Sequence, residues 1–140
     1  MSIDETVGAA ADAIRAMPEM AGIAVIEDRK GDVAARLQAA VAKTRFAVLV
    51  GWNGFRARSG SSKTIVGDTS LVVDIFERPA INGPAPVHLL DAARAIALAV
   101  NLSQQPGQSP IVFEEITPVG EPTPGTVSAS VTFKVCNSTL

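Results

Sequence analysis

The strongest constraint on the fold is a strict alternation of apolar and polar residues near the end of the chain. Between residues 127 and 136 every second side chain is apolar and the intervening ones are mostly polar: Val127, Ala129, Val131, Phe133 and Val135 alternate with Ser128, Ser130, Thr132, Lys134 and Cys136. Successive side chains of a strand point to opposite faces of its sheet. This period of two therefore predicts a strand with one face in the core and one face in solvent.

Four further segments are predicted to be strands. Residues 22–27 are short and rich in branched side chains, and residues 64–78 form a longer apolar run. Residues 46–50 are apolar on both faces, which is typical of a strand in the middle of a sheet, and their continuation through residue 56 is expected to emerge toward solvent. Residues 111–116 are the fourth segment, where Glu114 and Glu115 break the alternation and predict a bulge. We expect residues 119–125, with two prolines and two glycines, to be a connection.

Two amphipathic helices are predicted in the first third of the chain. Residues 3–16 carry apolar side chains at helical spacing, and Ser2 with Glu5 has the spacing of a capping box. The second helix begins after Asp32, which is expected to be its N-cap, and has one apolar stripe that contains Val33 and Leu37.

Residues 87–102 predict a third helix of a different kind. This segment is apolar almost all round, which indicates a helix that is buried on more than one side. We expect Leu90→Asp or Ile96→Asp to unfold the domain, because each would bury an unpaired carboxylate.

The order of these elements predicts the fold class. It is helix, strand, helix, strand, strand, helix, strand, strand, which indicates an α+β domain with a mostly antiparallel, mixed sheet covered on one face by helices. The 140 residues suit a single domain that spans 1–140. Apolar residues make up 47% of the chain and charged residues 19%, so the chain can bury a core.

The sequence offers little chemistry. The single Cys excludes an internal disulfide. One Cys and one His could hold zinc with four ligands only if several carboxylates joined them. A net charge of -2 and a pI near 5.3 argue against a surface that is basic throughout, as for nucleic acid. We predict no catalytic residue, no metal and no cofactor. A small hydrolase remains an alternative, and it would need a cleft that groups His88 with Asp74, Glu77 or Asp91.

One cluster stands out as a candidate interaction loop. Arg56, Arg58 and Lys63 lie between two predicted strands, and Trp52 and Phe55 lie just upstream as candidate aromatic anchors. Basic and aromatic side chains together bind nucleic acid or anchor a protein partner. A solvated hairpin tip with Trp52 in the core explains the same residues equally well.

The whole pattern resembles the phage tail terminator and tail-completion proteins, of the lambda-like minor tail protein U type. The residues that carry the resemblance are the opening amphipathic helix, the strand at 23–26 with the charged turn at 27–32, the strands at 48–50 and 73–77, and the Pro/Gly loop before an apolar helix. The resemblance implies a structural protein of a phage or prophage. Its small α+β subunits form a ring, commonly a hexamer, that caps the tail tube and docks to the head.

The implied partners are other copies of the chain, the major tail tube protein and the head-tail connector proteins, with a passing contact with DNA and no membrane. The implied location is the host cytoplasm during assembly and then the virion tail. A ring needs two different patches that meet head to tail, and the candidates are the apolar helix at 87–102 and the strand edges. A monomeric module that binds a small ligand or nucleic acid is the main alternative.

Overall fold

A computed structural model describes residues 2–28, 32–58, 65–78, 89–103, 109–123 and 125–139. It confirms the α+β class and the predicted order of elements. The elements are α1 (Ile3–Arg15), a short 3₁₀ helix (Pro18–Met20), β1 (Ala24–Glu27), α2 (Val33–Thr44), β2 (Phe46–Ala57), β3 (Val66–Glu77), α3 (Leu89–Val100), β4 (Ile111–Thr123) and β5 (Thr126–Thr139).

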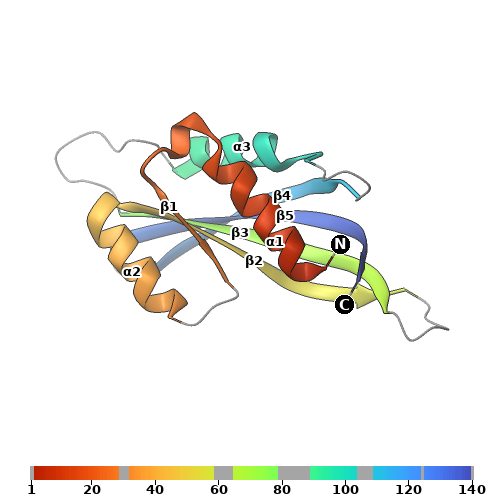
Figure 1. Cartoon of the computed structure of the whole chain (residues 1–140). Coiled ribbons are helices and arrows are strands. Elements are labelled where there is room, and N and C mark those ends of the chain that lie inside the picture. The colour runs from red at the N-terminus through yellow and green to blue at the C-terminus, as the bar shows by residue number, and fades with distance from the viewer. Residues whose placement is uncertain are drawn as a thin grey trace.

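The five strands form one mixed sheet in the order β1-β2-β3-β5-β4. β1 runs parallel to β2, and all other neighbours are antiparallel. Figure 1 shows α1 and α3 over one face of the sheet, which is called the covered face below. The helix α2 connects the parallel pair β1 and β2 and packs against these two strands on the other face. The rest of that second face, over β3, β5 and β4, is called the open face.

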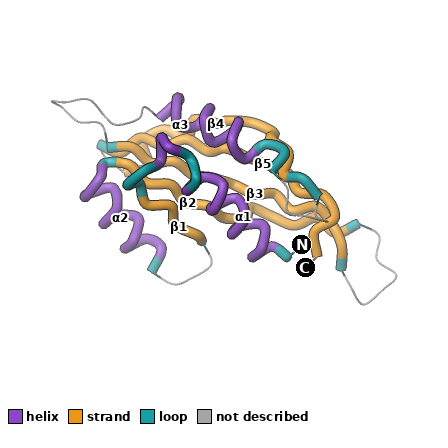
Figure 2. Tube along the Cα trace, turned by 45° about the horizontal axis from the view of Figure 1, so that its top comes forward, coloured by secondary structure: helices purple, strands orange, loops and turns teal. Residues whose placement is uncertain are grey.

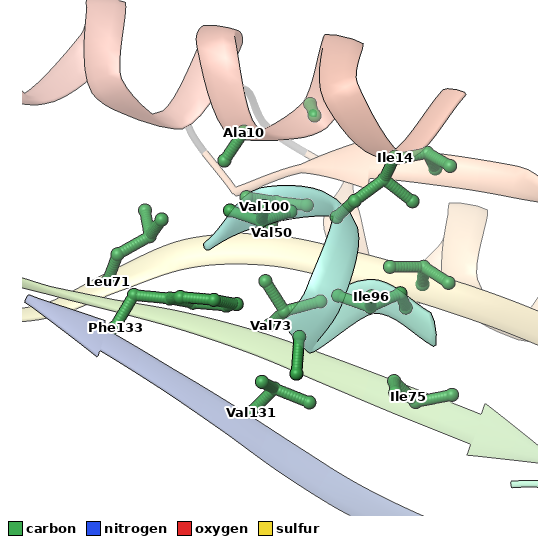
Figure 3. Close-up of a cluster of buried hydrophobic side chains, with 14 of the residues drawn as sticks. Ala10, Ile14, Val50, Leu71, Val73, Ile75, Ile96, Val100, Val131 and Phe133 are labelled. Atoms are coloured by element: carbon green, nitrogen blue, oxygen red, sulfur yellow. The ribbon is translucent and has the colours of Figure 1, made fainter. Parts of the chain in front are cut away.

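The core lies between the covered face and its two helices. In Figure 3, Ala10 and Ile14 of α1 point toward Val50 and toward Ile96 of α3. The largest fully buried side chains come from α1, α3 and the strands: Val7, Ile14, Phe46, Val48, Val50, Leu71, Val73, Ile75, Ile96, Val100, Ile111 and Phe133.

The predicted period of two in β5 is confirmed. Val131, Phe133 and Val135 are buried in the core, whereas Lys134 is exposed on the open face. The ring of Phe133 contacts Phe113 of β4 edge to face, with 6.0 Å between the ring centroids. β3 has the same alternation along its whole length, so the neighbouring strands β3 and β5 each have one buried face and one more exposed face.

The capping box of α1 is confirmed. For α2 the predicted residue is at the N-cap position, but it does not cap the helix through its side chain. The Ser2 hydroxyl accepts from the backbone N–H of Glu5 at 3.2 Å, and the Glu5 carboxylate accepts from the N–H of Ser2 at 2.9 Å. Asp32 does occupy the N-cap position of α2, but its side chain makes no capping hydrogen bond. The reason is its left-handed backbone, with φ 65°, instead of the extended conformation that a side-chain cap needs.

The prediction that α3 is buried on more than one side is wrong. Ala93, Ile96 and Val100 are buried, but Leu90 is 63% exposed and Leu98 is 79% exposed. α3 is therefore covered on its sheet side only, and the expectation that Leu90→Asp unfolds the domain is wrong with it. No helix within the described ranges is long and apolar enough to span a bilayer.

The predicted end of the fourth strand is also wrong, while its bulge is confirmed. The pairing of β4 with β5 shifts register between Phe113 and Glu115, as expected from the two acids. β4 then continues to Thr123 through the stretch expected to be a connection. A strand at the edge of a sheet tolerates proline because one side of its backbone has no neighbour, and β4 is such a strand.

Candidate functional site

The hairpin of β2 and β3 carries the predicted basic loop. Arg56 lies opposite Asp68 in the register of the two strands, and the backbone N–H of Arg58 donates to the carbonyl of Val66. Gly67 makes this close pairing possible, because a Cβ there would lie 2.2 Å from the carbonyl oxygen of Arg56. Lys63, the third predicted cation, lies outside the described residues.

Asp68 is the centre of an ion-pair cluster on the open face. Its carboxylate accepts from Nη2 of Arg58 at 2.8 Å and lies 3.5 Å from Nζ of Lys134 on β5. Partial desolvation raises the pKa of Asp68, but the charges of Arg58 and Lys134 and their hydrogen bonds lower it by more. The pKa of this carboxyl therefore lies below its ordinary value, and the cluster is an ion pair at neutral pH.

A shallow hollow of about 420 Å³ lies beside this cluster. Its walls come from β2, β3, β4 and β5, with the following lining residues: Gly54, Phe55, Arg56, Asp68, Thr69, Ser70, Glu114 and Lys134. The charged lining consists of the cations Arg56 and Lys134 and the carboxylates Asp68 and Glu114, and Lys134 is already paired with Asp68. The hollow is therefore close to electrically neutral and lacks the excess positive charge that binds phosphate.

The two aromatic residues of the hairpin differ in their place: Phe55 lines the hollow together with Arg56, whereas Trp52 is not among its lining residues. Trp52 and Phe55 lie opposite Leu71 and Thr69, which are the buried positions of β3, whereas Arg56 lies opposite Asp68 on the open face. Directly opposed residues share a face of the sheet. Trp52 is nonetheless 49% exposed, so the interpretation that placed it in the core is wrong. The predicted cluster is therefore only partly assembled, with Phe55 and Arg56 at the hollow and Trp52 apart from them.

Of the residues of the hydrolase alternative, Asp74 lies apart from the others that the structure describes, whereas Glu77 lies at the start of α3, whose first turn contains Asp91. Asp74 lies on the open face, where it accepts from the hydroxyl of Ser130, while Glu77 is buried on the covered face. Glu77 Oε2 accepts from the backbone N–H of Leu89 at 3.0 Å. This bond satisfies an N–H at the start of α3 that lacks a partner within the helix. His88 lies outside the described residues.

No metal site is formed by the residues that the structure describes, since no three His, Cys, Asp or Glu side chains gather there. Cys136 is a free thiol that is half-buried on β5. Its register position beyond Lys134 places it on the open face. We assign no role to it.

The sequence predicted the helix at 87–102 as a contact patch, but it did not predict which of its leucines are exposed. Leu90, Leu98 and Leu102 are 63%, 79% and 64% exposed, and they are called the leucine stripe below. Leu90 and Leu98 are eight residues apart, so they lie on one face of α3, and exposed Arg94 lies between them. The signal that could have found the stripe is the excess of leucine over what one helix face needs.

Leu102 differs from the other two leucines of the stripe in its backbone conformation. It is the second residue after α3 and has a left-handed backbone with φ 62°. Glycine is the favoured residue at this position after a helix, since a side chain destabilises the left-handed conformation. Leu102 is also exposed, so neither its backbone conformation nor burial in the described fold explains a leucine there.

The chain matches no protein-family model and no curated protein.

The described surface presents two contrasting candidates: a nearly neutral, open hollow on the hairpin and an apolar stripe along the outer side of α3.

Proposed function

We propose that this protein is a structural subunit of a phage or prophage tail, a tail terminator or completion protein that forms a ring on the end of the tail tube. The observation that carries the proposal is Leu102, which is both exposed and held at a positive φ. A residue that costs stability where it stands is a candidate for selection by function. A leucine side chain contributes through contact with another apolar surface and not through chemistry.

The leucine stripe supports a contact with another protein. Burying an exposed leucine contributes about 1.5–3 kcal/mol, so three leucines supply a useful share of a protein-protein affinity. Arg94 is exposed within the stripe, and arginine is a residue type enriched in such interfaces. We assign the stripe to the tail tube, because α3 lies over a face of the sheet and leaves both sheet edges available to neighbouring copies.

The assembly is tested by measuring the mass of the purified protein by light scattering over a range of concentrations, together with negative-stain imaging. The expected result is a ring with a central hole, formed by the protein alone or at the ends of added tail tubes. A protein that stays monomeric up to about 1 mM, where even weak contacts are populated, and does not bind tubes would overturn the proposal.

The stripe is tested with Leu102→Gly, combined in a second variant with Leu98→Ser. Leu102→Gly should leave thermal stability unchanged or raise it, because glycine relieves the left-handed backbone. Both variants should sediment less with tail tubes than the wild-type protein does. Ile65→Ser, which changes an exposed apolar residue away from the stripe, is the matched control and should sediment normally. Normal sedimentation of the double variant would remove the stripe as the tube contact.

A monomeric binding module is the second candidate, and the hollow on the hairpin favours it. Its volume of about 420 Å³ is within the range of small-molecule sites. Its open, nearly neutral character weakens the case for nucleic acid. Titration with inorganic phosphate and with a short single-stranded oligonucleotide, followed by NMR, tests this function. Saturable shifts at Arg56 and Lys134 in a protein that never self-associates would favour the module over the ring.

A further inference from the structure

The edge strand β4 and the helix α2, which packs at the opposite edge of the sheet, carry opposite charge. The edge strand β4 contains Glu114, Glu115 and Glu121, and it contains no Lys or Arg. All three glutamates are exposed. At this edge Val112 and Val119 are 40% and 55% exposed, so the acids surround apolar surface.

The surface of α2, beside the opposite edge, is basic, while exposed Asp28 and Asp32 lie between β1 and the helix. The other edge strand is β1, and α2 packs against it and against β2. Arg36 and Lys43 are the only charged residues of α2, and Arg45 follows directly as its C-cap. All three are exposed. Arg78 adds a fourth exposed cation nearby, since its backbone N–H donates to the carbonyl of Arg45 at 2.8 Å. This set of four is called the α2 cations below.

Neither set is neutralised within the fold. No ion pair joins Glu114, Glu115 or any of the α2 cations to another described residue, in contrast with the paired charges around Asp68. Figure 2 shows that α2 and β4 lie on opposite sides of the molecule, so they cannot neutralise each other within one copy. Glu114 lines the hollow with Arg56 and Lys134, and Asp28 and Asp32 lie just before α2 in the chain. None of these opposite charges forms an ion pair with either set.

We propose that the β4 edge of one copy binds the α2 surface of the next copy, which makes the contact head to tail. This inference rests on the proposed function, because it names the two patches from which the ring is built. A contact between two different patches repeats from copy to copy and closes into a ring when the rotation allows. Complementary charge steers the two patches together and fixes their register.

The contact is made by side chains and not by adding strands across the edge. β4 contains Pro118 and Pro122, and its pairing with β5 shifts register at three places. Prolines, bulges and charges are the features with which edge strands avoid indiscriminate pairing. A helix surface such as α2 also offers no unpaired backbone groups in its middle. The acids of β4 and the α2 cations are then the groups that make the contact specific.

Charge reversal tests the contact directly. One variant combines Arg36→Glu with Lys43→Glu, so that α2 itself, whose only charged residues these are, becomes negative like β4. A second combines Glu114→Lys with Glu115→Lys, so that both edges become positive. Each variant alone should lose association by roughly 100-fold or more, because like charges then face one another. Circular dichroism and thermal melting check that both variants fold, and Glu19→Lys, an exposed reversal away from both edges, should assemble normally.

Mixing provides the decisive result. In a 1:1 mixture of the two variants each negative edge meets a positive one, so rings with alternating copies should form although neither variant assembles alone. A single chain with all four substitutions should also assemble, since its polarity is reversed but its edges remain complementary. Assembly of the wild-type protein should weaken from 0.05 M to 1 M salt, as the screening length falls to about 3 Å.

The outcomes separate this inference from the proposed function. A wild-type protein that forms rings while both reversed variants form them equally well would overturn the edge contact and leave the function standing. Folded variants that fail to assemble in the mixture would overturn it as well. A wild-type protein that forms no ring, alone or on tail tubes, would overturn both proposals together.

Discussion

The helices α1 and α2 have similar lengths and similar amphipathic patterns, yet the fold uses them differently. α1 contributes five buried residues: Thr6, Val7, Ala10, Ala11 and Ile14. α2 contributes none. Among the described residues, α1 packs against α3 and against the strands β1, β2, β3 and β5, whereas α2 packs mainly against the pair β1 and β2 at one edge. An apolar stripe therefore shows which side of a helix faces a sheet. The position of the helix on the sheet decides how much of that stripe is buried.

The largest predicted effect comes from placing a charge on each side of α3, the other helix of the covered face. Ile96→Asp should cost more than about 4 kcal/mol and unfold the domain, because it buries an unpaired carboxylate in the core. Leu90→Asp changes an exposed residue of the same helix and should alter stability by less than about 0.5 kcal/mol. Urea unfolding of both variants measures the difference. Equal losses would show that the outer side of α3 is covered.

The second prediction compares α1 and α2 directly through one truncation in each. Ile14→Ala removes a fully buried side chain of α1 and should cost about 2–5 kcal/mol. Leu37→Ala removes a half-buried side chain of α2 and should cost about 1 kcal/mol, because less area is lost. The free energies of unfolding of the two variants give the test. Costs of the same size would mean that α2 is as well packed as α1.

A third, smaller contrast concerns how the two helices begin. Ser2→Ala removes the capping hydrogen bond of α1 and should cost about 1 kcal/mol. Asp32→Gly removes no capping hydrogen bond at the start of α2 and should be neutral or stabilising, because residue 32 has a left-handed backbone. Thermal melting of the two variants compares the caps. A clear loss in Asp32→Gly would indicate a role for this carboxylate beyond the cap position.

Local patterns predicted the elements well because each has a local physical cause. The alternation in β5, the capping box at Ser2 and the bulge at Glu114 all follow from the spacing of neighbouring residues. The end of β4 was missed for a physical reason. Pro118 and Pro122 suggest a connection by composition, but a strand with a neighbour on only one side accommodates them. Which strand is an edge depends on the topology, which no local pattern contains.

The candidate sites were less predictable because they depend on residues far apart in the sequence. Arg56 and Arg58 were identified from the loop alone, but their setting includes Asp68 on the next strand and Lys134 on β5. The leucines of α3 read as core residues because an apolar helix does not show which of its sides a sheet will cover. Only the completed fold separates Ile96 from Leu98.

The smallest predicted effect concerns the ion pairs of Asp68, which lie on the open face that α1 and α3 leave uncovered. The folded-state pKa of Asp68 is lowered, so its contribution to stability is fully present above the unfolded value, about 3.9. It is lost as the pH falls through the lower folded value. Asp68→Asn should therefore be slightly less stable than the wild-type protein at pH 7, and the difference should disappear in strong acid.

The same pairs should also respond to salt, because they are partly exposed to solvent. At pH 7 the small gap between Asp68→Asn and the wild-type protein should narrow as the salt concentration rises, while the gap for Ile14→Ala should persist. The charged pairs are screened by ions, whereas a buried apolar contact is not. A gap for Asp68→Asn that ignores both salt and acid would mean that its carboxylate acts through packing. The open face would then differ from the covered face in how its side chains pack, and not in the charge that it carries.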